Sequence, residues 1–204
     1  MRRSLLFFLA ASALTLGLAG ALSAADAPRP SAHVLVAYYS LHGNTEKMAR
    51  GAAEGASRVQ GVTVVTKRVE EVTKEDLVAA DGIVLGGPAY FANIPGKMKD
   101  ALDQWNWKLK VDFTDKVGGA LATGGGQTGG KEHVVMSLLL FMLSNRMIVA
   151  GPLYEDEQGD SKWGEMGSSA MTGPLDPGVS DKELDAARRI GQRVAQLARR
   201  FKGR

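Results

Sequence analysis

The chain has 204 residues, with 25 glycines, three histidines, no cysteine, 23% charged residues and 45% hydrophobic residues. This composition suits one globular domain and excludes a disordered or collagen-like chain. The absence of cysteine excludes disulfides, iron–sulfur clusters, thiolate zinc sites and cysteine nucleophiles, and His33, His42 and His133 are too scattered to form a ligand cluster. Any chemistry must therefore use other groups.

The charge of the chain gives little information about partners. The formal net charge is +3, but Arg2 and Arg3 belong to an N-terminal segment that has the pattern of a leader. Without these two, 23 basic residues stand against 22 acidic ones. A nearly neutral chain offers no electrostatic basis for binding nucleic acid, so we expect no nucleic-acid partner.

The first 25 residues (1–25) have the organisation of a signal peptide: paired arginines, an apolar run at 5–22, and small residues at 23–25. Residues 26–32 are then a short linker, and 33–204 form the folded domain. We expect an exported, periplasmic protein, and the paired arginines resemble a twin-arginine export signal. An uncleaved N-terminal membrane anchor is the alternative, because the apolar run is just long enough to cross a bilayer.

Segments with the pattern of strands alternate with segments that have the periodicity of helices. Strands are expected at 33–39, 62–69, 82–85, 117–122 and 147–150, and helices at 48–59, 73–80, 94–105, 134–143 and 180–201. Residues 151–179, rich in Gly, Ser, Asp and Pro, are expected to form a long loop. Five strands alternating with helices predict an α/β domain with a doubly wound parallel sheet.

In such a sheet ligands bind at the carboxyl ends of the strands, and three of these ends carry polar or glycine-rich loops. The first loop, residues 40–45, offers hydroxyls, a glycine and the N–H groups of a helix N-terminus, a combination that suits a phosphate. Ordinary capping of the helix by Asn44 or Thr45 explains the same residues without a ligand. The sequence leaves both interpretations open.

The glycine cluster around residue 125 matches two nucleotide motifs that its context contradicts. Residues 124–129 match the dinucleotide pattern, but this pattern belongs after the first strand and needs an acidic residue about 20 positions later, and 145–152 contain none. The run that ends at Lys131 imitates an NTPase phosphate loop, but Glu132 stands where a serine or threonine must bind magnesium. The glycines either let the backbone lie against a flat ligand or form a flexible loop.

Three segments taken together resemble the flavodoxin-like NAD(P)H:quinone oxidoreductases, the WrbA-like family. They are Val34–Arg50, Gly86–Asn93 with Leu102–Gln104, and Ala122–Gln127, in the family's order and spacing over nearly all of the mature chain. The resemblance implies a flavodoxin-like five-stranded sheet of order 2-1-3-4-5 with FMN bound beside the first and third strands. It also implies an FMN-dependent NAD(P)H dehydrogenase (quinone), with NADH or NADPH as donor and a quinone or similar flat molecule as acceptor. No catalytic side chains are expected, because the flavin supplies the redox chemistry.

The resemblance assigns the site residues loop by loop. It places the FMN phosphate at Ser40, Leu41, His42, Gly43, Asn44 and Thr45. It places the isoalloxazine between Pro88, Ala89, Tyr90, Phe91 and Asn93 on one side and Thr123, Gly124, Gly125, Gly126, Gln127 and Thr128 on the other. Asn145 matches a family histidine that reaches the flavin site, and His42 and Trp107 match positions near the nicotinamide and the substrate. For Trp105, on an apolar stripe, we expect core packing instead.

Two departures from the family leave other functions open. Asn145 cannot titrate near neutral pH, and Tyr90 replaces an arginine that could meet a phosphate. One alternative is a flavodoxin-like electron carrier with a protein redox partner, although such carriers tend to be strongly acidic. The other is a flavin-fold binding protein without nicotinamide-dependent activity.

Residues 134–143 are apolar on nearly all sides and too few to span a membrane, so they predict a buried helix or an interface. The family commonly forms dimers and tetramers. We therefore expect a homodimer or homotetramer.

Overall fold

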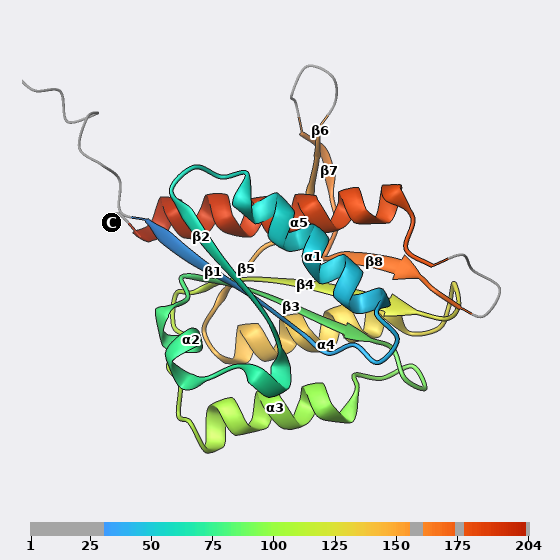
Figure 1. Ribbon diagram of the computed structural model, residues 1–204, viewed down its shortest axis with the longest axis horizontal. Helices are drawn as coiled ribbons and strands as arrows, with labels where there is room; N and C mark the ends of the chain where they lie inside the picture. Colours follow the sequence, from blue (N-terminus) through green and yellow to red (C-terminus); the bar gives the residue numbers. More distant parts are fainter. Residues whose placement is uncertain (1–30, 156–160, 174–177, 203–204) are drawn as a thin grey trace, which may run out of the picture.

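A parallel β-sheet runs through the middle of the molecule and carries helices on both faces (Figure 1). The computed structural model describes residues 31–155, 161–173 and 178–202. The expected signal peptide and most of the linker lie outside these residues. Among the described helices, none combines the length and the apolar character needed to cross a bilayer.

The order of the strands in the sheet confirms the flavodoxin-like prediction. It is β2-β1-β3-β4-β5, and each neighbouring pair is parallel. These strands are β1 (Ala32–Tyr38), β2 (Val62–Arg68), β3 (Gly82–Pro88), β4 (Val117–Gly124) and β5 (Ile148–Val149). The strands β1, β3 and β4 are buried almost throughout, because helices cover both of their faces.

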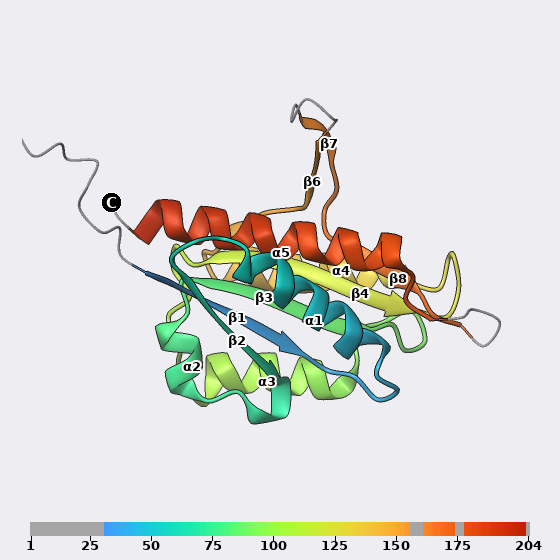
Figure 2. The same ribbon diagram turned by 45° about the horizontal axis from the view of Figure 1, so that its top comes forward.

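The predicted long loop at 151–179 is wrong in part, because it contains three strands. These are β6 (Leu153–Glu155), β7 (Ser161–Gly164) and β8 (Ser168–Met171). The antiparallel pair β6–β7 stands away from the body in both ribbon views (Figures 1 and 2). Strand β8 pairs with the last four residues of β4, whereas the very short β5 pairs with the first two. The fifth position of the sheet is therefore shared by two short strands.

The helices form a layer on each face of the sheet. They are α1 (Asn44–Ser57), α2 (Lys74–Ala79), α3 (Gly96–Trp107), α4 (Lys131–Ser144) and α5 (Asp181–Lys202), with a short 3₁₀ helix at Val69–Glu71. One core lies between the sheet and α1 and α5, and the other lies between the sheet and α2, α3 and α4 (Figure 2). Trp105 is buried in the second core, as predicted. Because every parallel strand runs the same way, the loops that follow β1, β3 and β4 meet at one edge.

Candidate functional site

A pocket at the carboxyl edge of the sheet brings the three predicted loops together. Its volume is about 130 Å³. The residues that line it are Ser40, Leu41, His42, Asn44, Thr45, Pro88, Ala89, Tyr90, Thr123, Gly124, Gly125 and Thr172. Of these, Thr172 alone was not predicted. Eleven of the seventeen positions assigned to the three loops thus line one concave site, and the other six, Gly43, Phe91, Asn93, Gly126, Gln127 and Thr128, do not line it.

The N-terminus of α1 opens onto this pocket without a side-chain cap. Gly43 occupies the N-cap position with φ of 88°, a left-handed conformation that glycine adopts readily, and no side chain caps this end. The Gly43 N–H donates to Ser40 Oγ at 3.1 Å, and the first helical bond runs from the Lys47 N–H to the Gly43 carbonyl at 2.8 Å. Capping by Asn44 or Thr45 is therefore wrong, and the first-turn N–H groups remain available to an anion.

A pair of buried threonines joins the first loop to the third. Thr45 Oγ1 and Thr123 Oγ1 lie 2.8 Å apart and share a hydrogen bond. Both residues are almost completely buried, although both line the pocket. A hydroxyl can donate one hydrogen bond and accept others, so this pair can also meet a ligand oxygen. Together with Ser40, this pair forms a set of uncharged hydroxyl donors next to the uncapped N-terminus of α1.

The second loop is a tight turn with two strained residues. Tyr90 and Asn93 exchange both backbone hydrogen bonds at 3.0 Å, and the residues between them, Phe91 and Ala92, have φ of 50° and 63°. Positive φ is costly for a residue with a Cβ atom, and such strain clusters at functional sites. The Phe91 side chain is fully exposed and is not part of the pocket lining.

Tyr90 presents a buried hydroxyl beside the pocket. Its ring packs edge-to-face against Tyr39 with the ring centroids 6.3 Å apart. Its Oη atom is buried and makes no hydrogen bond within the described structure. Burial raises the pKa of Tyr90, and the neighbouring Tyr39 adds to this rise. The group therefore stays protonated at neutral pH and can donate a hydrogen bond to a ligand.

The side chain of Lys131, the first residue of α4, anchors the third loop. The Lys131 side chain is 9% exposed, and its Nζ donates to the Gln127 carbonyl at 3.0 Å and to Glu132 Oε1 at 3.1 Å. Gly126, Gln127 and Thr128 are not among the residues that line the pocket. The Thr172 N–H donates to the Gly124 carbonyl at 2.8 Å, which ties β8 to this loop.

Two predicted residues lie far from the pocket within the same chain. Trp107 ends α3, whose first residue follows the second loop, so about 16 Å of helix separates them at 1.5 Å per residue. Asn145 directly follows α4, and its Nδ2 donates to the Phe141 carbonyl at 2.8 Å, which caps the end of that helix. The structure does not bring either residue together with the three loops.

Comparisons with known proteins identify the family of the chain. The family model for NADPH-dependent FMN reductase matches residues 30–158, which is more than half of the chain. The chain belongs to this family. An NAD(P)H dehydrogenase (quinone) from Solidesulfovibrio magneticus is 31% identical over 204 residues, covering 83% of this chain and 99% of the relative. A flavodoxin from Aquifex aeolicus is 35% identical, covering 80% and 85%.

Solved structures show the same fold. The flavodoxin-like WrbA-like protein from Agrobacterium tumefaciens superposes with a TM-score of 0.63 at 24% identity, covering 83% of this chain and 99% of that one. A flavodoxin from the domain Archaea gives a TM-score of 0.64 at 20% identity, covering 81% and 98%. Family membership and fold confirm the predicted resemblance, the oxidoreductase class and FMN as the cofactor of the family.

The hydrogen-bond donors at the pocket suit a phosphorylated flavin, the cofactor of this family. The uncapped first turn of α1 and the hydroxyls of Ser40, Thr45 and Thr123 can hold a phosphate without a charged side chain in the loop. The unpartnered Tyr90 hydroxyl is a further hydrogen-bond donor beside the pocket. The residues present are therefore compatible with FMN on their chemistry.

Sequence reasoning missed Thr172 and the anchoring role of Lys131. A lysine at the first position of a helix opposes the helix dipole, and this anomaly was a usable signal for Lys131. No local pattern marks Thr172, because its place depends on the pairing of β8 with β4.

Proposed function

We propose that this protein is an exported FMN-dependent oxidoreductase that transfers two electrons from NADH or NADPH to a quinone or a similar flat acceptor. The observation that carries the proposal is the uncapped N-terminus of α1, which opens onto a pocket lined by Ser40, Thr45 and Thr123. Donor and acceptor rest on relatives named NAD(P)H dehydrogenase (quinone), which are about 30% identical over nearly their whole length.

In this proposal, the residues of the chain bind FMN and orient it. When bound, FMN supplies the hydride and electron chemistry. The first loop holds the phosphate, Pro88 and Tyr90 border one side of the ring, and Gly124 and Gly125 allow the backbone to approach the other side. Leu41, which lines the pocket, and Phe91, in the second loop, are both exposed, so they can cover a flat acceptor stacked on the ring.

A one-electron carrier that serves a protein partner is the second candidate. The Aquifex aeolicus relative that is 35% identical to this chain is named flavodoxin, which favours this candidate. The near balance of acidic and basic residues argues against it, because a carrier of this kind is expected to be strongly acidic. Reduction of the bound flavin by NADH or NADPH distinguishes the oxidoreductase from the electron carrier.

The experiment is a spectroscopic titration of the purified mature chain. The protein is reconstituted with FMN, and the flavin absorbance is followed without oxygen during addition of NADH or NADPH, then of a soluble quinone. We expect bleaching by a nicotinamide and recovery of the flavin absorbance on addition of the quinone. Dithionite serves as the control reductant.

Two other results contradict the proposal in different ways. A flavin that dithionite bleaches but both nicotinamides leave oxidised points to the electron carrier. A chain that FMN cannot reconstitute removes both redox functions and leaves a binding protein.

Export is part of the proposal and rests on the leader pattern at 1–25. A twin-arginine signal would export the chain already folded, with FMN in place.

A further inference from the structure

Arg68 supports the first loop of the pocket from the neighbouring strand. It is the last residue of β2, and its Nη2 donates to the Ser40 carbonyl at 2.5 Å. Ser40 is 3% exposed, and its Oγ in turn accepts the Gly43 N–H. The guanidinium thus fixes the residue at which the chain leaves β1 and turns toward the N-terminus of α1.

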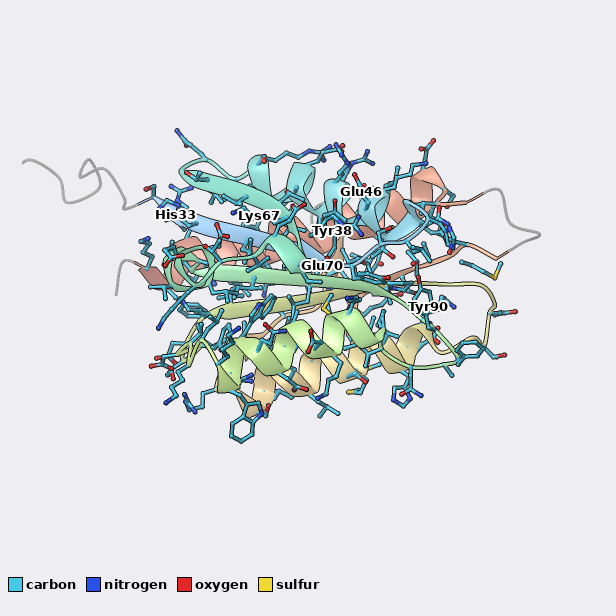
Figure 3. The ribbon with its side chains drawn as sticks, turned by 60° about the horizontal axis from the view of Figure 1, so that its bottom comes forward. His33, Tyr38, Glu46, Lys67, Glu70 and Tyr90 are labelled. Atoms are coloured by element: carbon cyan, nitrogen blue, oxygen red, sulfur yellow. The ribbon has the colours of Figure 1, made fainter. Side chains whose placement is uncertain are left out.

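The surroundings of Arg68 hold its side chain in place. The guanidinium lies 5.7 Å from the centre of the Tyr38 ring, and Glu46 and Glu70 each lie 4.0 Å away. Figure 3 shows Tyr38, Glu46 and Glu70 gathered near the ends of β1 and β2. About one third of the side chain is exposed, so the group is partly shielded from water.

Of the two cations in α1, Lys47 is engaged elsewhere and Arg50 pairs directly with Glu46. Lys47 Nζ donates to the Val179 carbonyl at 2.9 Å, and Arg50 pairs with Glu46 at 2.7 Å. Residues 40–45 contain no lysine or arginine. Glu46 lies in the first turn of α1, so its negative charge opposes an anion at that helix end unless cations offset it. Arg68 is placed to supply part of that offset.

We propose that Arg68 makes the pocket selective for the phosphorylated flavin over its unphosphorylated form. It acts as a positioning residue: it fixes the Ser40 main chain so that the loop's donors converge on the phosphate, and it offsets the charge of Glu46. This inference rests on the proposed binding of FMN. It distinguishes two ligands that share the ring and differ in the phosphate, namely FMN and riboflavin.

The test compares the affinities of the two flavins for the mature chain after removal of bound flavin. Arg68→Ala should weaken FMN binding by about tenfold or more, because hydrogen bonds to charged groups are lost or misaligned. Riboflavin affinity should change by less than about twofold, because riboflavin makes no phosphate contact. Arg68→Lys keeps the charge and should recover part of the FMN affinity.

Lys67→Ala is the matched control. Lys67 is the preceding residue of the same strand, but its Nζ pairs with Asp76 of α2 at 2.7 Å, away from the loop. The control removes the same charge but leaves the hydrogen bond from Arg68 to the Ser40 carbonyl in place. The ratio of the FMN and riboflavin affinities should therefore stay at the wild-type value.

The ratio of affinities also identifies failure. An equal loss for both flavins in Arg68→Ala and Arg68→Lys means that Arg68 only stabilises the fold, and no loss means that it has no role; either result overturns the inference. If Arg68→Ala does not fold, the same ratio in Arg68→Lys decides. Failure of the wild-type chain to bind FMN would instead overturn the proposed function.

Discussion

At the scale of single residues, the groups that the pocket offers to an anion are uncharged hydrogen-bond donors. Ser40, Thr45 and Thr123 contribute hydroxyls, and the start of α1 contributes N–H groups, while Arg68 stands behind the loop. Neutral donors at a helix end bind a phosphate without the strong salt dependence of exposed ion pairs. Under the proposed function, the affinity for FMN therefore depends on a few hydroxyl groups.

We predict that Ser40→Ala combined with Thr45→Ala lowers the affinity for FMN about a hundredfold or more. Each hydrogen bond to a charged group contributes about 1.5–3 kcal/mol, and two are removed. Fluorescence titration of the flavin measures the loss. Removal of the Thr45 hydroxyl also leaves buried Thr123 without its 2.8 Å partner, so the melting temperature should fall.

Two control variants separate phosphate binding from general damage. Thr45→Ser keeps the hydroxyl and should retain most of the affinity. Thr63→Ala removes an exposed hydroxyl from β2 near the opposite edge of the sheet and should have no effect. Unchanged FMN affinity in the double alanine variant would remove the phosphate assignment of this loop.

Most pocket residues could be predicted because they lie at the ends of buried strands or directly after them. The apolar run before Ser40 and the glycines before Pro88 mark strand ends, and topology brings such ends together. Asn145 and Trp107 could not be placed by the same logic, because each lies at the far end of a helix that begins near the pocket. Their positions follow from helix length and direction rather than from a local pattern.

At the scale of elements, α1 and α5 pack at a crossing made by small residues. Gly51 and Gly55 of α1 face α5, and Gly191 of α5 faces α1. A Cβ atom on Gly191 would overlap the Ala52 backbone, and one on Gly55 would overlap the Arg188 backbone. The helix backbones are therefore closer than residues with side chains allow. Since the N-terminus of α1 opens onto the pocket, this packing also holds the proposed phosphate site in place.

We predict that Gly191→Ala destabilises the protein by about 1–3 kcal/mol through overpacking. The intrinsic preference of alanine for helix, about 1 kcal/mol, acts in the opposite direction and is outweighed. Urea denaturation measures the difference. Gly96→Ala is the control, because a Cβ atom at this position of α3 meets open space. Equal stability of Gly191→Ala and the wild type would contradict the close crossing.

Strands were predictable where they are apolar and were missed where pairing alone forms them. The run that became β1 is buried on both faces, whereas β8 consists of Ser168–Met171, which lacks strand-forming character. Strand β8 exists because it pairs with Leu121–Gly124 beyond the end of the short β5. Long-range pairing of this kind leaves no local mark in the sequence.

At the scale of the whole molecule, α4 carries more apolar side chains than the described part of the chain buries. Val134, Leu138 and Met142 are buried in the core, as the prediction of a buried helix requires. Met136, Leu140 and Leu143 are exposed on the same helix, the last two by more than half. Their spacing places them along one stripe, and residues 134–143 contain no charge. Exposed apolar side chains gathered on one face are typical of protein interaction surfaces.

We predict that this stripe joins copies of the chain into a homodimer or homotetramer, because an uncharged apolar surface is complementary to itself across a twofold axis. Leu140→Glu combined with Leu143→Glu should produce monomers, since burying two carboxylates in such an interface is unfavourable. Size-exclusion chromatography with light scattering measures the mass. Val78→Glu, which alters an equally exposed apolar residue on α2, should leave the oligomer intact. A wild-type chain that stays monomeric at micromolar concentration would show that α4 is exposed in solution as well.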